Sequence, residues 1–145
     1  MNAYSFVQHL HSGFRYIVLV LFIYTILQAF IGWLAGRPYD NRNRLTNLFA
    51  MISAHTQLLI GIVLYFLSPL VAFNSTTMKD PVTRYFTMEH GVMMLIALVL
   101  ITIGHSKSKK LVLPEAKHKT IALFYTLALL IIIGTLAAGK ISILK

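Results

Sequence analysis

Four long apolar runs constrain this chain more than any other feature of its sequence. They cover roughly residues 16–35, 48–73, 85–104 and 121–138, and the second is interrupted near Ser68-Pro69. Each approaches the ~20 residues that an α-helix needs to cross a hydrocarbon core about 30 Å thick. Because backbone N–H and C=O groups find no water in lipid, such a segment must form a helix that satisfies them internally. The sequence therefore predicts an all-α integral membrane protein in contact with the lipid bilayer.

The connections between these runs are short, which favours an up-down arrangement. We expect a four-helix bundle that forms a single domain over residues 1–145. Its predicted spans are about 14–35, 47–69, 83–105 and 120–139. Asn2 and Ser5 are candidate caps for the first helix, and Asp80-Pro81 is a typical helix start. The composition agrees, since 57% of the 145 residues are hydrophobic and 12% are charged, too few for a soluble domain.

Basic residues are unevenly distributed between the connections. Eight of the 13 Lys and Arg lie in two of them: Arg37, Arg42, Arg44, Lys107, Lys109, Lys110, Lys117 and Lys119. The positive-inside rule places both of these loops in the cytoplasm, with the two termini and the loop 70–83 outside. The net charge is +9, and we expect the basic residues of the loops to interact with anionic lipid headgroups. The sequence has no basic patch interleaved with aromatic residues, so it does not indicate nucleic-acid binding.

Six histidines are many for a membrane chain of this length. His9 precedes the first apolar run, and His105 and His118 flank the lysine-rich loop, so we expect these three to be hydrated and without a special partner. His11, His55 and His90 fall within the predicted helices, where an ionisable side chain is costly and usually functional. At 1.5 Å per residue, His55 lies about 10 Å inside the hydrocarbon and is expected to face the bundle interior.

Helical spacing predicts which residues share a helix face with His11 and with His90. One stripe of the first helix consists of His11, Arg15, Val18, Phe22, Thr25, Ala29 and Gly32. Met94 follows on the face of His90, together with Ala97 and Ile101, where a flexible thioether and a small residue leave room for a flat group.

Glu89 stands directly before His90 at the head of the third predicted span. Three roles are open to its carboxylate. It can orient a ligating imidazole, carry protons, or form an ion pair with Arg15 or Arg84.

Two neutral imidazoles from different helices of a membrane bundle are the usual ligands of b-type haem. The chain has no cysteine, which excludes a covalently attached c-type haem and thiolate-held iron–sulfur clusters. His11 and His90 belong to helices that are diagonal in an up-down bundle, and Arg15 and Arg84 are placed to hold the haem propionates. A pairing of His55 with His90 stays open, with His11 then serving a second site or a quinone.

Five segments carry a resemblance to known proteins: HSGFRY (11–16), HTQLLIGIVLY (55–65), MKD (78–80), EH (89–90) and IGHSKSKK (103–110). They resemble the recurring segments of short bacterial four-helix membrane proteins labelled cytochrome b. The resemblance covers most of the chain and implies a bundle in the bacterial inner membrane with haem ligands at His11, His55 and His90. The chain is more loosely similar to one half-bundle of haem A synthase, although its predicted fourth helix contains no histidine.

The predicted function is that of a membrane b-type cytochrome-like protein that binds haem b and transfers electrons. A quinone and a redox membrane complex are the candidate partners, with Glu89 or a histidine taking up the proton. A stand-alone enzyme is less supported, because the sequence has no Ser/His/Asp arrangement, phosphate-binding glycine loop or pair of catalytic carboxylates.

Two other functions stay open. Imidazoles and thioethers suit Cu(I), so a copper-handling protein is one alternative. Its ligands would come from the outer side: His9, His11, Met78, Met88 and His90. The other is an accessory subunit without a cofactor, in which the histidines form interhelical hydrogen bonds. A homo-oligomer is compatible with each of these functions.

Overall fold

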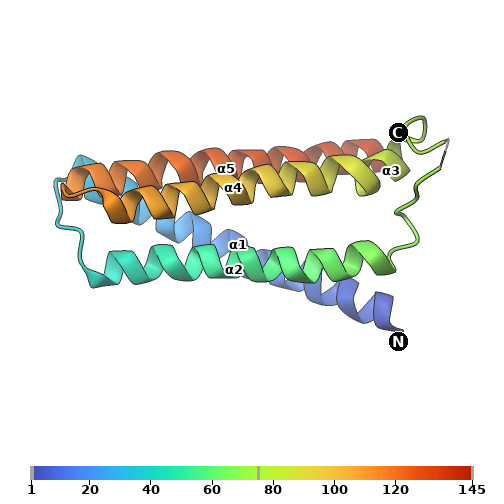
Figure 1. The fold of residues 1–145 in the computed structure, drawn as a ribbon, viewed down its shortest axis with the longest axis horizontal. Helices are drawn as coiled ribbons and strands as arrows, with labels where there is room; N and C mark the ends of the chain where they lie inside the picture. Colours follow the sequence, from blue (N-terminus) through green and yellow to red (C-terminus); the bar gives the residue numbers. More distant parts are fainter. Residues whose placement is uncertain (1, 75, 145) are drawn as a thin grey trace.

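Four long helices lie side by side in the computed structural model, which describes residues 2–74 and 76–144 (Figure 1). They are α1 (Ala3–Leu34), α2 (Asn41–Leu67), α4 (His90–Lys110) and α5 (Pro114–Leu144). A short helix α3 (Pro81–Arg84) and a π-helical segment η1 (Tyr85–Glu89) lead directly into α4. Four helical stretches are long and apolar enough to cross a membrane: α1, α2, the continuous stretch Pro81–Lys110 that joins α3, η1 and α4, and α5. The prediction of an all-α, membrane-embedded four-helix bundle is therefore confirmed.

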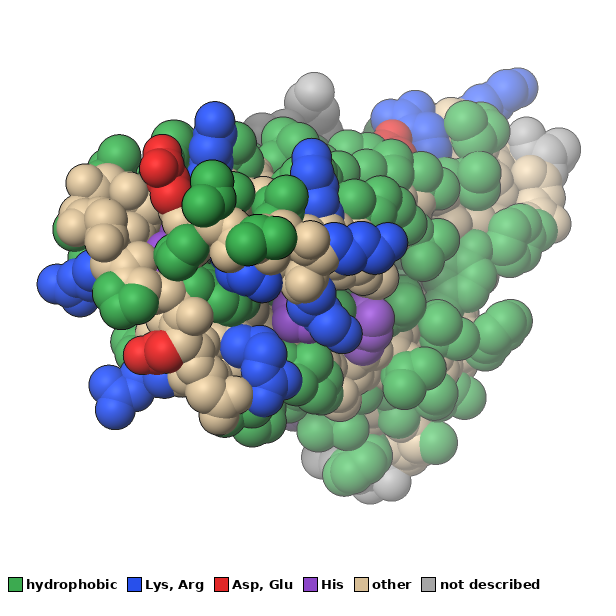
Figure 2. Space-filling view, turned by 60° about the vertical axis from the view of Figure 1, so that its left-hand side comes forward, with side chains coloured by type: hydrophobic (Ala, Val, Ile, Leu, Met, Phe, Trp, Pro, Cys, Tyr) green, Lys and Arg blue, Asp and Glu red, His purple; other side chains and the backbone are tan. Residues whose placement is uncertain are grey.

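The helices alternate in direction, as predicted. The α1–α2 and α4–α5 connections lie at one end of the bundle, and both termini and the α2–α3 loop lie at the other (Figure 1). Lys and Arg side chains gather at the first of these ends, which we call the basic end (Figure 2). Around the bundle, α1 packs between α2 and α5, and α5 packs against α4. Of the four neighbouring pairs, α2 and α4 have the least contact. Consequently α1 and α4 are diagonal to each other.

Polar caps fix where the helices begin. The Asn2 side chain accepts from the Ser5 N–H at 2.8 Å, so α1 starts well before the first apolar run. Its 32 residues correspond to about 48 Å, more than the ~30 Å hydrocarbon core, and α1 runs obliquely across the bundle (Figure 1). Asp80 caps α3, with Pro81 in its first turn, and the hydrogen bond from the Thr83 hydroxyl lowers the pKa of the Asp80 carboxyl.

Alanines, branched aliphatic side chains and two aromatic rings form the core. Ala50, Ala54, Ala97 and Ala128 are buried between helices, where small side chains let the backbones approach closely. The predicted stripe of α1 is confirmed from Val18 to Gly32, since Val18, Phe22, Thr25, Ala29 and Gly32 are all buried. The Phe22 ring packs on the Tyr125 ring with centroids 5.1 Å apart. The Tyr125 hydroxyl donates to the Asn47 carbonyl at 2.9 Å, which ties α5 to α2.

Gly32 allows close packing of α1 against α5 near the basic end. A Cβ at this position would lie 2.5 Å from Cε1 of His118, whose side chain is 2% exposed. The imidazole is also held from the α1–α2 connection, because its Nε2 donates to the Pro38 carbonyl at 3.2 Å. The ring therefore has little freedom to move away.

We predict that Gly32→Ala lowers the stability of the bundle by roughly 1–3 kcal/mol, because the added methyl group forces the two helices apart. Gly13→Ala is the matched control in the same helix, since a Cβ there meets nothing within 4 Å. Thermal unfolding in detergent, followed by circular dichroism, measures both variants. Equal midpoints for the two variants would contradict this account of the packing.

Candidate functional site

His11 and His90 meet between the diagonal helices α1 and α4. Their ring centroids are 6.3 Å apart and the ring planes form an angle of 76°. Gly61 of α2 makes room for His11, because a Cβ there would lie 3.2 Å from Cε1 of that ring. Gln57 of α2 also donates to the His11 carbonyl at 2.7 Å. Two of the three predicted ligands are thus brought together, and α2 supports one of them.

The π-helical segment η1 determines which side chains accompany His90. In this wider turn the His90 N–H bonds to the Tyr85 carbonyl, so residues five positions apart face the same way. Tyr85 accordingly lies beside His90, with its hydroxyl 3.2 Å from Nδ1, and Arg84 lies beside Glu89. Isolated π turns of this kind occur frequently at functional sites. Sequence analysis did not find Tyr85, because no residue pattern distinguishes a π turn from ordinary helix.

The expectation that His55 faces the bundle interior is wrong. Its side chain is exposed and lies at the seam between α2 and α4, where Nε2 is 2.9 Å from the Thr102 hydroxyl oxygen. The Thr102 hydroxyl donates its hydrogen to the Leu98 carbonyl, so His55 Nε2 must be the donor in the first contact. The reason is the packing of α2, which buries Ala50 and Ala54 against its neighbours and leaves the His55 face outside. His55 does not join the His11–His90 pair.

The charged candidates are divided between two interactions. Arg84 Nε donates to Glu89 Oε1 at 2.8 Å, which realises one of the roles left open for Glu89, and Arg84 Nη1 donates to the Met78 carbonyl at 3.2 Å. The Arg15 guanidinium lies over the Tyr16 ring, 5.1 Å from its centroid. Among the described residues Arg15 forms no ion pair. Met94 is half-buried on the predicted face, where Ala97 and Ile101 are fully buried.

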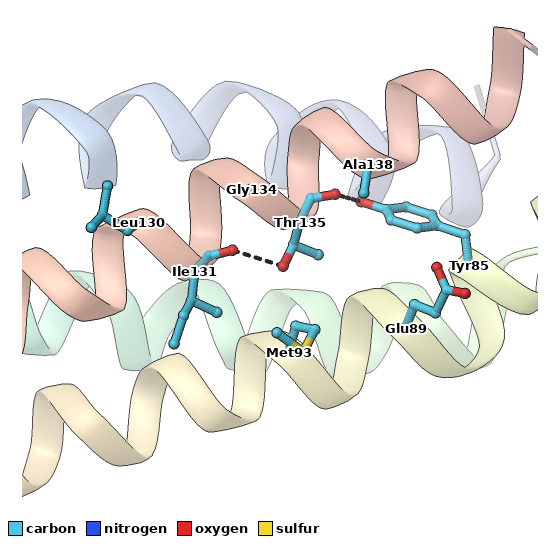
Figure 3. Close-up of a pocket in the computed structure, with 8 residues that line it drawn as sticks. All are labelled: Tyr85, Glu89, Met93, Leu130, Ile131, Gly134, Thr135 and Ala138. Carbon is cyan, nitrogen blue, oxygen red and sulfur yellow. Dashed lines mark hydrogen bonds between the residues drawn. The ribbon is translucent and has the colours of Figure 1, made fainter.

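A cavity of about 380 Å³ opens beside this site, between α4 and α5. Tyr85, Glu89 and Thr135 contribute its polar groups, and the rest of its wall consists of Met93, Leu130, Ile131, Gly134 and Ala138 (Figure 3). The Tyr85 hydroxyl reaches across to α5 and donates to the Thr135 carbonyl at 2.9 Å (Figure 3). The Glu89 carboxylate points toward α5 at the same level (Figure 3).

His105 and His118 are buried, which corrects the expectation that they are hydrated interfacial residues. They are 4% and 2% exposed, and His105 Nδ1 has no hydrogen-bond partner in the described part of the chain. His118 also belongs to α5, so the last helix does contain a histidine. Helical spacing carried the missing signal: His105 is four residues after the buried Ile101, and His118 is seven before the buried Tyr125.

His118 packs edge-on against Tyr39 of the α1–α2 connection, with ring centroids 5.1 Å apart. Burial of that connection raises the pKa of the Tyr39 hydroxyl, and Asn47 donates to the hydroxyl oxygen at 2.7 Å. The Lys117 ammonium lies 5.4 Å from the centre of the Tyr39 ring. The basic end is thus closed by a packed layer that holds a histidine beneath the lysines.

The residues considered for copper are spread along the end of the bundle opposite the basic end. His9 donates from Nδ1 to the Ser5 carbonyl at 2.8 Å, a local contact within α1. Met78 and Met88 are 62% and 41% exposed. Across residues 2–74 and 76–144, no three His, Asp or Glu side chains form a group that could hold a metal ion by themselves.

Comparisons with known proteins add nothing to this geometry: no family model, curated protein or solved structure matches the chain.

Proposed function

We propose that this chain is a membrane b-type cytochrome-like protein in which His11 and His90 would hold a haem. The observation that carries the proposal is the approach of these two imidazoles from diagonal helices, with centroids 6.3 Å apart. An imidazole nitrogen lies about 2 Å from the metal that it binds, so two rings on opposite sides of one ion have centroids roughly 6 Å apart. The observed separation is therefore compatible with a shared iron.

The remaining chemistry of the pair also fits haem. His11 Nδ1 is buried and has no hydrogen-bond partner within residues 2–74 and 76–144, although a buried polar atom normally has one. Two imidazoles complete the coordination of a metal when the other ligands come from elsewhere, and the porphyrin of haem supplies its own four nitrogens. When bound, haem supplies one-electron redox chemistry. The weak packing of α2 against α4 suits a bulky flat group between the helices.

The chain's own residues would hold and insulate such a group. Arg15 lies one turn from His11 and has no carboxylate partner among the described residues, so it is the better candidate to bind a propionate. Arg84 is already engaged with Glu89. Met94, Ala97 and Ile101 continue the face of His90 with apolar surface, half-buried at Met94 and fully buried at the other two.

We predict that the protein purified in detergent is red, with a Soret band that shifts on dithionite reduction, and that His11→Ala and His90→Ala each lose this pigment. His55→Ala is the matched control, because His55 lies within a span but donates to Thr102 outside the pair. Absorption spectra and haem-to-protein ratios measure all three variants. Retention of the pigment in both His11→Ala and His90→Ala would exclude this ligand pair.

The same preparation separates the proposal from its two alternatives. A colourless protein with stoichiometric copper would support copper handling instead. A preparation with neither haem nor copper would support an accessory subunit whose histidines only stabilise the bundle.

We propose that the cavity beside Glu89 binds a quinone, which exchanges electrons with the haem. Its volume of about 380 Å³ falls in the range of small-molecule sites, and its walls are largely apolar. Oxidation of a quinol releases protons as well as electrons, and the Glu89 carboxylate at the rim can accept a proton. The Tyr85 hydroxyl links this cavity to His90.

We predict that Glu89→Gln slows reduction of the haem by a soluble quinol analogue roughly 100-fold, since a positioned proton acceptor typically contributes this much or more. Stopped-flow absorbance measures the rate. Reduction by dithionite, which needs no such acceptor, stays unchanged. An unaltered quinol rate in the variant would remove Glu89 and its cavity from the reaction.

The basic end is proposed to face the cytoplasm of a bacterial inner membrane, because loops rich in Lys and Arg are retained there. Since the chain has no cysteine, single cysteines report this directly. Lys79→Cys at the outer end should react with a membrane-impermeant maleimide in intact cells. Lys110→Cys should react only after lysis. Both lysines are exposed, so the opposite labelling pattern would reverse the orientation.

A further inference from the structure

We infer that Tyr85 is a positioning residue that fixes the tautomer of His90 and thereby presents Nε2 of that imidazole as the ligating atom. The inference rests on the proposed function for its consequence, since it names which nitrogen faces the iron. Its structural basis is independent of any bound group. It is a chain of hydrogen bonds from α4 through η1 to α5.

The direction of these hydrogen bonds follows from the number of available hydrogens. A carbonyl oxygen only accepts, so at 2.9 Å the Tyr85 hydroxyl donates to the Thr135 carbonyl. A phenol has a single O–H hydrogen, and this one is engaged. In the second contact, at 3.2 Å, His90 Nδ1 must therefore donate to the Tyr85 oxygen. A neutral imidazole with its hydrogen on Nδ1 has a free lone pair on Nε2.

Two features hold the Tyr85 ring in this position. The π turn of η1 places Tyr85 and His90 on the same side of the helix, although they are five residues apart. Gly139 of α5 supplies the space, because a Cβ there would overlap the Tyr85 ring. Tyr85 is itself buried, with 4% of its surface exposed, which restricts the movement of its ring.

The opposite arrangement at His55 shows that the protein distinguishes its histidines. Thr102 gives its hydrogen to Leu98, so His55 donates from Nε2 and that nitrogen has no lone pair for a metal. Metal-ligating histidines almost always donate their other ring N–H to a fixed acceptor, which orients the ring and raises its basicity. The Tyr85 oxygen is such an acceptor for His90.

Nuclear magnetic resonance of the protein with ¹⁵N-labelled histidine, freed of haem, tests the tautomer directly. We expect His90 to carry its hydrogen on Nδ1 and His55 on Nε2, with His90→Gln and His55→Gln assigning the signals. This readout needs no haem, so it stands even if the proposed function fails. A His90 that carries its hydrogen on Nε2 would overturn the inference.

The variant Tyr85→Phe then tests the consequence for haem. Loss of the acceptor should weaken haem retention about 10- to 100-fold, as for other groups that orient a metal ligand. It should also raise the reduction potential, because a less basic imidazole stabilises ferric iron less. Tyr65→Phe is the matched control: the Tyr65 hydroxyl donates to the Thr87 carbonyl at 2.8 Å near the same end and, in the part of the chain that the structure describes, forms no hydrogen bond to a histidine.

The two variants separate a positioning role from a merely structural one. The inference predicts that only Tyr85→Phe changes the His90 tautomer and the potential, whatever both variants do to thermal stability. The same potential in Tyr85→Phe and Tyr65→Phe, together with an unchanged His90 tautomer, would contradict it.

Discussion

The approach of His11 to His90 is the contact on which the proposed site depends. Diagonal helices of a four-helix bundle are normally kept apart by the side chains between them. Here Gly61 has no side chain, which leaves space for the His11 ring. The π turn at Tyr85–Glu89 sets the direction of His90. Both departures come from helices that would otherwise be ordinary membrane spans, and both bring an imidazole toward the bundle axis.

A second polar layer lies at the opposite end of the bundle. His118 fits against Gly32 and Tyr39, and His105 is buried one turn before Ser108. These contacts hold together the end at which the lysines and arginines gather (Figure 2). The two ends thus differ in chemistry. The basic end exposes lysines and arginines over a buried layer that contains His105 and His118. The other end combines the His11–His90 pair with the Glu89 carboxylate and an adjoining cavity.

Much of the fold could be predicted because lipid leaves a long apolar run no alternative to a helix. The stripe from Val18 to Gly32, the buried face of Ala97 and Ile101, and the start at Asp80-Pro81 all follow from spacing and capping rules. These rules describe single helices. They placed the diagonal relation of the first and third spans correctly, because an up-down topology allows few arrangements.

The site could be predicted only in part, for reasons that differ between residues. Depth in the membrane does not determine the face of a helix, so His55 was expected inside although Ala50 and Ala54 occupy the packed side of α2. Proximity to lysines suggested hydration for His105, whereas its spacing from Ile101 placed it in the core. Tyr85 could not be found at all, since its role depends on a π turn that residue patterns do not reveal.

Electron paramagnetic resonance of the oxidised protein tests the central claim most directly, because it reports both the ligands of a ferric haem and the angle between their planes. Two imidazoles at 76° to each other should produce a low-spin signal with the large g anisotropy of nearly perpendicular rings. A high-spin signal, the less anisotropic low-spin signal of parallel rings, or the absence of iron would contradict the pairing of His11 with His90.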